Sequence, residues 1–154
     1  MVEKNKTSKI KSVEKLAADL LKGLEVEVKM EVVDDEGLFR INLTLDDPSI
    51  LIGHHGRNLF ALQTVLSQMA YRQAGEARVL VDVDGYRKQR EDQLRDSALE
   101  LAERVKKSGK EQALVPMSPF ERRIIHLALS EDEGVETTSD GEGADRHIVI
   151  KLKS

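Results

Sequence analysis

The sequence predicts an α+β protein made of two small domains in series, each a small sheet with helices on one face, joined by a long helix. Three observations predict this class. The chain has 154 residues, which suits one or two small domains. Helix-spaced and strand-like apolar patterns follow one another along it, in two successive groups. Aromatic residues make up only 3% of the chain, so the cores are expected to be small and aliphatic.

The first predicted domain begins with an amphipathic helix that ends near Gly23, because apolar residues recur there at three- and four-residue spacing. Two half-buried strands follow at about 26–32 and 39–45, where apolar and polar residues alternate. Residues 34–37 between them are turn formers ending in glycine, which predicts an antiparallel hairpin. The remaining elements are a short helical turn at 49–52, a helix from Arg57 and a strand at 78–83.

The second group of elements starts with a longer amphipathic helix from Tyr86 to about Lys107, ended by Gly109. Ser118 and Pro119 are typical of a helix cap and first turn. The elements expected after the long helix are an extended pair at 114–115, a helix at 120–129 and strands at about 135–138 and 147–152. We therefore predict a first domain at 8–84, a linking helix at 85–108 and a second domain at 109–154.

Composition excludes several function classes. The chain has no cysteine, which removes disulfides, thiolate zinc sites and cysteine nucleophiles. No apolar run approaches the length of a membrane span, and the lysine-rich start lacks the apolar stretch of a signal peptide, so a cytoplasmic protein is expected. No catalytic triad, Walker loop or histidine pair for zinc is visible, so we expect no catalytic residue, no metal and no cofactor.

The segment Gly53–His54–His55–Gly56 places two glycines three residues apart between two predicted helical segments. Without Cβ atoms, such a loop lets a nucleic-acid backbone approach closely, and the start of the next helix attracts phosphate. By itself the pattern also fits an ordinary helix–turn–helix, but the order of elements around it favours a binding loop. Two neutral imidazoles between the glycines attract phosphate less than lysine or arginine would.

The segment Arg122–Arg123–Ile124–Ile125–His126 places Arg122 and His126 on one face of the predicted helix, where both can contact a phosphate. The spacing alone carries almost no information. The Pro- and Ser-containing run before it and the glycine-rich loop leading to Arg146 after it make the pattern more specific.

With these motifs in place, residues 8–84 resemble a KH domain in the topology with strands ahead of the GxxG loop, and the C-terminal region resembles the R-3-H domain. The resemblance implies a cleft holding about four nucleotides of single-stranded RNA beside the loop, and a second face for single-stranded nucleic acid. The tandem order is similar to the Jag (KhpB) family of bacterial RNA-binding proteins. It implies a second small KH-domain protein as partner and a role in cell elongation, division and envelope control. Many members carry an N-terminal Jag domain, for which the short stretch before the first predicted helix leaves no room.

The residues expected to bind RNA form two sets. In the first domain Gly53 and Gly56 admit the backbone, His54, His55 and Arg57 meet phosphates, and Ile50, Ile52 and Ile41 form an apolar cleft floor. In the second domain the set is Arg122, Arg123, His126 and Arg146. Little aromatic stacking is expected, because Phe39, Phe60 and Phe120 are interpreted as core residues.

Several alternatives stay open. The basic start of the long helix, with Arg87, Lys88, Arg90 and Arg95, fits either a backbone track or a solvated face. The acidic residues after position 130 fit charged turns better than a cation site. The net charge of −4 also suits an interaction scaffold that pairs with another KH protein and has only vestigial RNA affinity. Binding of single-stranded DNA and homo-oligomer formation are not decided by the sequence.

Overall fold

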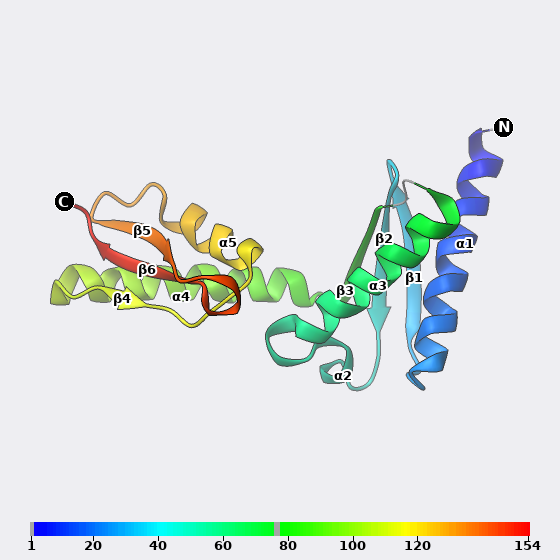
Figure 1. The fold of residues 1–154 in the computed structure, drawn as a ribbon, viewed down its shortest axis with the longest axis horizontal. Coiled ribbons are helices and arrows are strands. Elements are labelled where there is room, and N and C mark those ends of the chain that lie inside the picture. Colours follow the sequence, from blue (N-terminus) through cyan, green and yellow to red (C-terminus); the bar gives the residue numbers. More distant parts are fainter. Residues whose placement is uncertain (1, 76–77) are drawn as a thin grey trace. The chain divides into compact units, whose positions relative to one another are not determined.

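The structure is a computed structural model that describes residues 2–75 and 78–154. The chain divides into two compact units, Met1–Arg87 and Lys88–Ser154, each with its own hydrophobic core (Figure 1). The predicted class, mixed α+β domains in series, is confirmed.

The first unit is a three-stranded sheet with helices packed on one face. Its elements are α1 (Val2–Gly23), β1 (Lys29–Asp35), β2 (Leu38–Thr44), α2 (Ser49–Ile52), the 3-10 turn η1 (His54–Gly56), α3 (Arg57–Ala74) and β3 (Arg78–Val83). The strand order is β1-β2-β3, with β1 and β2 antiparallel and β2 and β3 parallel. Helix α1 packs on β1 and β2, and α3 packs on β3 and α1. Strand β3 therefore forms one edge of this sheet.

The core of this unit is aliphatic, as the composition predicts. Along β2 buried and exposed residues alternate, so one face of the sheet is covered and the other faces solvent. Helix α3 contributes a stripe at helical spacing to the covered face: Leu59, Leu62, Leu66 and Ala70. This packing fixes the axis of α3, and with it the position of the loop that precedes the helix.

The first strand begins three residues later than the apolar alternation predicts. After α1, Glu25 takes a left-handed conformation with φ 57°, and the Val26 N–H donates to the Leu21 carbonyl at 3.1 Å. Residues 26–28 thus complete the exit from the helix, although Val26 and Val28 pack against the core. Pairing with β2 starts only at Lys29, opposite Thr44. The apolar alternation correctly predicts that Val26 and Val28 pack against the core, but it does not predict where backbone hydrogen bonding with β2 begins.

The hairpin between β1 and β2 closes as predicted. Asp35 pairs with Leu38, which leaves Glu36 and Gly37 as a two-residue turn. Both turn residues have positive φ, 50° and 88°. Positive φ at both central positions is the signature of a type I′ turn, whose twist matches that of the flanking strands.

The second unit is built on a separate antiparallel sheet with the order β4-β6-β5. Its elements are α4 (Tyr86–Ser108, whose first two residues belong to the first unit), β4 (Gln112–Ala113), α5 (Pro119–Leu129), β5 (Val135–Asp140), the 3-10 turn η2 (Gly143–Asp145) and β6 (His147–Leu152). The core combines residues of both helices and of the sheet: Leu94, Ala98, Ala102, Val105, Ile124, Ile125, Leu129, Val135, Ile148 and Ile150.

This core changes the interpretation of the long helix. The sequence suggests a linking helix at 85–108 between two domains, but four buried residues of α4 belong to the second core. The division between the compact units falls between Arg87 and Lys88. From Lys88 onward, α4 is therefore part of the second unit. Among the described residues, no helix is long and apolar enough to cross a membrane.

Candidate nucleic-acid interface

The Gly53–Gly56 loop has a backbone that depends on its two glycines. Gly53 has φ 69° and ψ −175°, a conformation essentially confined to glycine, and Gly56 is left-handed with φ 80°. Space is equally limiting, because a Cβ on Gly53 would lie 2.5 Å from Asn58 Cγ and 2.9 Å from the Asn58 backbone nitrogen. A Cβ on Gly56 would lie 2.9 Å from Cε1 of Tyr86. Both glycines are therefore required by conformation and by close approach.

Asn58 braces this loop from the first turn of α3. Its Nδ2 donates to the Ile50 carbonyl at 2.8 Å, which ties the end of α2 to the start of α3. The Gly53 N–H donates to the Ser49 carbonyl at 2.9 Å, so the loop is also tied to α2 through the backbone. No side chain caps the N-terminus of α3 at Gly56. The first N–H groups of α3 carry the positive end of the helix dipole, which suits an anionic ligand.

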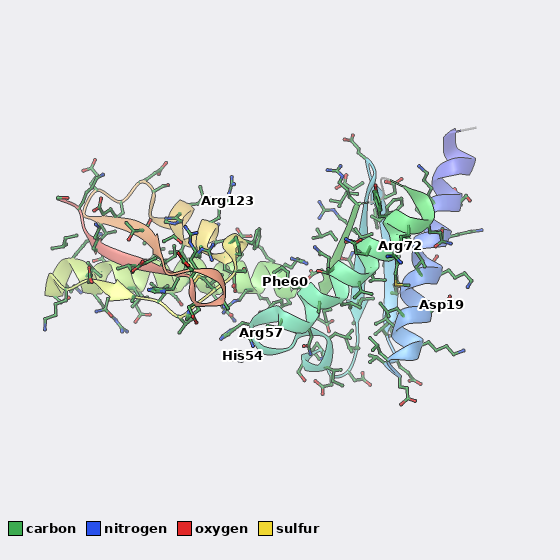
Figure 2. All side chains as sticks on the ribbon, viewed as in Figure 1. Asp19, His54, Arg57, Phe60, Arg72 and Arg123 are labelled. Carbon is green, nitrogen blue, oxygen red and sulfur yellow. The ribbon has the colours of Figure 1, made fainter. Side chains whose placement is uncertain are left out.

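The charged and polar side chains expected at this loop lie at its surface. His54, His55 and Arg57 are exposed, and Figure 2 shows His54 and Arg57 at the same end of α3. The two imidazole rings lie beside each other, with centroids 4.0 Å apart and planes tilted by 54°. His55 itself has φ 51°. The loop therefore presents two adjacent imidazoles and one guanidinium around a bend in the backbone.

The three isoleucines expected to form an apolar cleft floor have different environments. Ile50 is 54% exposed, and Ile52 is half-buried against the core. Ile41 is fully buried in the middle of β2. A side chain with no exposed surface does not contact a base, so the assignment of Ile41 to the cleft floor is corrected to a core role. Alternation along β2 predicts that Ile41 points to one face, but the helices that cover this face are a tertiary feature.

In the second unit, Arg122 and His126 of α5 each have a hydrogen-bond partner outside the helix. Nδ1 of His126 contacts Oγ1 of Thr137 on β5 at 2.5 Å, which leaves Nε2 as the ring nitrogen for a ligand. Arg122 Nη1 donates to the Met117 carbonyl at 2.8 Å, before the start of α5. Burial, together with the nearby Arg122 charge, lowers the pKa of His126 below its ordinary value. The ring is therefore predominantly neutral at pH 7, beside a permanent cation.

Arg146 also contacts β5, through Ser139. Its Nε donates to Oγ of Ser139 at 2.8 Å. Ser139 and Thr137 are two residues apart on β5, and residues at this spacing share one face of a strand. The structure thus attaches Arg146 and His126 to neighbouring positions on one face of β5. Arg123 is exposed on α5, as Figure 2 shows.

Glu121 is a residue of this site that the sequence analysis did not single out. It is 5% exposed, and its carboxylate accepts from Arg90 Nε at 2.8 Å and from the N–H and hydroxyl of Ser118, each at 3.0 Å. With Ser118 it forms a capping box at the start of α5, one residue before Arg122. The Ser-x-x-Glu spacing is a readable sequence signal for this box. The ion pair with Arg90, 31 residues away, has no local signal.

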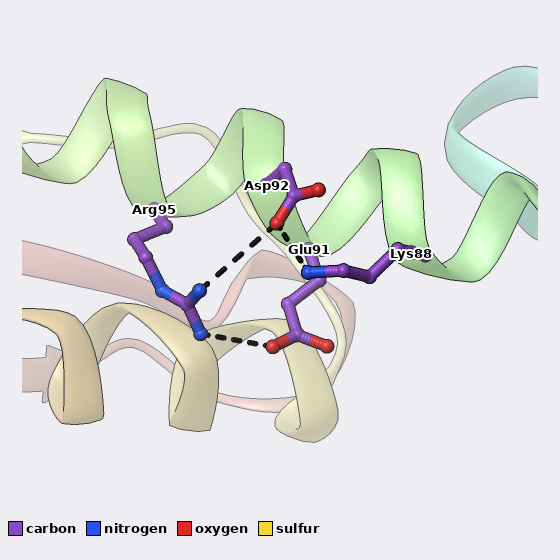
Figure 3. A network of polar contacts seen from close by, with 4 residues as sticks. All are labelled: Lys88, Glu91, Asp92 and Arg95. Atoms are coloured by element: carbon purple, nitrogen blue, oxygen red, sulfur yellow. Dashed lines mark hydrogen bonds and ion pairs between the residues drawn. The ribbon is translucent and has the colours of Figure 1, made fainter.

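The basic start of α4 is engaged within the protein. Lys88 pairs with Asp92 at 2.7 Å, and Arg95 pairs with Glu91 at 2.9 Å and lies 4.0 Å from Asp92 (Figure 3). Arg90 is the partner of Glu121 described above. These ion pairs compensate the positive charges locally. Lys88 and Arg95 fit the interpretation of a solvated, salt-bridged face, whereas Arg90 is largely buried against Glu121. Among the described residues, no group of three or more acidic or histidine side chains is placed to hold a metal ion.

Comparison with known proteins agrees with both halves of this arrangement. The family model described as KhpA/KhpB, KH domain matches residues 11–83, and the R-3-H domain model matches residues 92–152. The chain therefore carries a KH domain of the KhpA/KhpB type followed by an R-3-H domain. The R-3-H match includes most of α4, in agreement with the contribution of this helix to the second core.

Curated relatives carry the same family name. The RNA-binding protein KhpB of Clostridium symbiosum is 39% identical over 131 residues, which are 84% of this chain and 59% of the relative. KhpB of Bacillus subtilis (strain 168) is 37% identical over 125 residues, 79% of this chain and 60% of the relative. KhpB of Streptococcus pneumoniae D39 is 33% identical over 129 residues, 82% of this chain and 39% of the relative. The chain thus spans about three fifths of the length of the first two relatives.

Proposed function

We propose that this chain is a non-enzymatic protein that binds single-stranded RNA through the Gly53–Gly56 loop and through the α5–β5 face. The observation that carries the proposal is the loop itself. Its glycines adopt conformations that other residues rarely adopt, and it leads directly into an α3 N-terminus without a side-chain cap. The relatives named RNA-binding protein KhpB support the same function.

In this proposal the loop binds the sugar–phosphate backbone. The missing Cβ atoms allow a phosphate to approach the N–H groups at the start of α3. His54 and Arg57 contact neighbouring phosphates, and Ile50, with half of its surface exposed, offers apolar contact to a base. Ile41 has no part in it.

The second binding face consists of Arg122, Arg123, His126 and Arg146. Arginine contacts phosphate through a planar set of donors, and neutral His126 offers Nε2 as donor or acceptor according to its tautomer. Two weak sites in one chain reinforce each other when a single RNA is long enough to reach both, because the second contact becomes intramolecular. We place the protein in the cytoplasm as a post-transcriptional regulator or RNA chaperone linked to cell elongation, division and envelope control. Its proposed partner is a second small KH-domain protein.

The test is fluorescence anisotropy with a labelled single-stranded RNA of about fifteen nucleotides. Gly53→Asp and the double variant Arg122→Ala, Arg123→Ala are each expected to weaken binding by roughly tenfold or more, the cost of one or two charge-assisted contacts. Matched controls are Gly23→Asp, whose added Cβ meets nothing within 4 Å, and Arg95→Ala, Arg104→Ala, which removes two exposed arginines of α4. If the variants and the controls lose the same affinity for RNA, the loss comes from the change in net charge alone, and the two-site proposal is overturned.

A second candidate function is an interaction scaffold that pairs with another KH protein and binds RNA only weakly. The ion-paired arginines of α4 and the net charge of −4 favour it. Cross-linking followed by sequencing of bound RNA separates the two functions. A scaffold recovers its protein partner with little RNA, and it shows no affinity tighter than about 10⁻⁴ M in the anisotropy assay.

A further inference from the structure

A groove of about 420 Å³ lies at the end of α3 away from the Gly53–Gly56 loop. It is lined by Ser67, Gln68 and Tyr71 of α3 and by Arg78 and Val79 of β3. Tyr71 is 62% exposed, which makes it one of the most exposed large hydrophobic side chains of the described chain. We propose that this groove binds one nucleobase of the RNA, stacked on Tyr71, with Arg78 contacting the adjoining phosphate. The inference rests on the proposed RNA-binding function and extends it to a second position in the first unit.

The chemistry of the lining fits a nucleotide. An exposed aromatic ring beside an arginine is the combination with which proteins bind single strands, because every base has a face to stack and every nucleotide a phosphate. Ser67 and Gln68 add donors and acceptors for the edge of a base. A bound protein segment would need a larger apolar surface than these five residues provide.

The groove lies on the helix face that also leads to the loop. Phe60, Gln63, Ser67 and Tyr71 follow one another at three- and four-residue spacing and so share one side of α3. Figure 2 places Phe60 near the loop end and Arg72, the neighbour of Tyr71, near the other end of this helix. Tyr71 lies fourteen positions after Arg57 in α3, a rise of roughly 21 Å. A strand held at the loop must therefore extend beyond the loop to reach Tyr71.

Between the two positions the edge of β3 is occupied by side chains. Arg87 donates from Nε to the Val81 carbonyl at 2.7 Å and from Nη2 to Gln63 Oε1 at 2.6 Å, and its guanidinium lies 5.3 Å from the Phe60 ring centroid. Gln63 Oε1 also accepts from the Val81 N–H at 3.1 Å. Both backbone groups of Val81 are thus engaged, and a base cannot bond to them.

Val79 lies two residues before Val81 on β3, so the backbone groups of both residues face the same edge of the sheet. At Val79 this edge lines the groove. The track along α3 therefore has the loop at one end, a section closed by Arg87 in the middle, and the Tyr71 groove at the other end. This arrangement assigns a base to the groove rather than to the middle of the strand.

The experiment uses the full chain and RNAs of about four and about fifteen nucleotides. The protein contains no tryptophan, so Tyr71→Trp introduces a single fluorescent reporter into the groove. Its fluorescence is expected to be quenched by the long RNA and unaffected by the short one, which occupies only the loop. Tyr71→Ala is expected to weaken binding of the long RNA by about 5- to 150-fold, the range for loss of one base–aromatic stack. Binding of the short RNA stays within about twofold.

Two further variants control for the fold of α3. Tyr71→Phe keeps the ring and is expected to keep affinity for the long RNA within about twofold. Val65→Ala truncates another exposed side chain of α3, 45% exposed, and is expected to have no effect.

The outcomes separate this inference from the proposed function. If the long RNA binds, the Tyr71→Trp reporter is not quenched and Tyr71→Ala binds as the unmutated chain does, the groove is not a base site, while loop binding stands. If neither RNA binds the unmutated chain, both proposals fail. If the reporter responds to protein concentration without RNA, the groove belongs to an interface with a second copy, which also overturns the inference.

Discussion

Substitution of Glu121 by alanine is expected to destabilise the second unit more than any exposed charge change does. The carboxylate holds Arg90 Nε at 2.8 Å, with 19% and 7% of the two side chains exposed, and it accepts twice from Ser118. Glu121→Ala leaves the Arg90 charge largely buried without its partner, which costs about 3 to 5 kcal/mol for a buried pair. Because Arg90 keeps some exposure, the low end applies, and loss of half the capping box adds about 0.5 to 1 kcal/mol. The expected loss is therefore about 3 to 4 kcal/mol.

The assay is urea unfolding monitored by hydrogen exchange at the amides of α5 and β5. A signal from the whole chain would average the two units. The matched control is Glu100→Ala, which removes another Glu–Arg pair whose members are both about two-thirds exposed, and it is expected to cost less than about 0.5 kcal/mol. In a double-mutant cycle, adding Arg90→Met to Glu121→Ala is expected to recover part of the loss, since the unpaired charge disappears. If Glu121→Ala costs no more than Glu100→Ala, the reasoning about burial is refuted.

Three smaller perturbations test the loop and the histidine. Asn58→Ala removes the hydrogen bond that braces the loop, so RNA affinity is expected to fall about three- to tenfold in the anisotropy assay. The free energy of unfolding is expected to fall by about 1 kcal/mol. Unchanged affinity would mean that the loop keeps its shape without this hydrogen bond. Gly56→Ala forces a Cβ against Tyr86 at a φ of 80°, and a loss of about 1 to 3 kcal/mol in urea unfolding is expected. For His126, whose pKa is lowered by burial and by Arg122, the unfolded chain takes up the proton first as the pH falls. Stability of the second unit is thus at its full value above about pH 6.5 and declines below it, a decline that His126→Gln is expected to reduce and an NMR titration of the ring to locate.

The sequence predicts most of the framework because local patterns and packing agree along it. The limits of β3 at 78–83 and of the hairpin turn follow from alternation and turn chemistry, which act over a few residues. The start of β1 does not follow from the sequence. Backbone pairing with β2 begins at Lys29, opposite Thr44, although the apolar alternation already begins at Val26. Phe120 is also misjudged: it is 52% exposed, since helical spacing places it beside the buried face of α5 but not on it.

The candidate sites divide in the same way. The glycine loop and the Arg122–His126 spacing are readable because each depends on residues close together in sequence. The partners of the site residues cannot be read from the sequence. The contact of Thr137 with His126 and the ion pair of Glu121 with Arg90 both depend on the tertiary fold. Burial of Ile41 and exposure of Tyr71 likewise require knowledge of which face the helices cover.

The ion pairs of α4 lead to a quantitative expectation for salt dependence. If RNA is held mainly by Arg57, Arg122, Arg123, Arg146 and the Arg78 proposed above, about five phosphates are neutralised, and log K should fall against log salt with a slope of roughly −0.7 per contact for a single strand, about −3.5 in all. The double variant Arg122→Ala, Arg123→Ala should reduce the slope to about −2.1. A slope beyond about −5 would require the arginines of α4 to release their acidic partners for RNA, and the interpretation of that helix as a salt-bridged face would then be wrong.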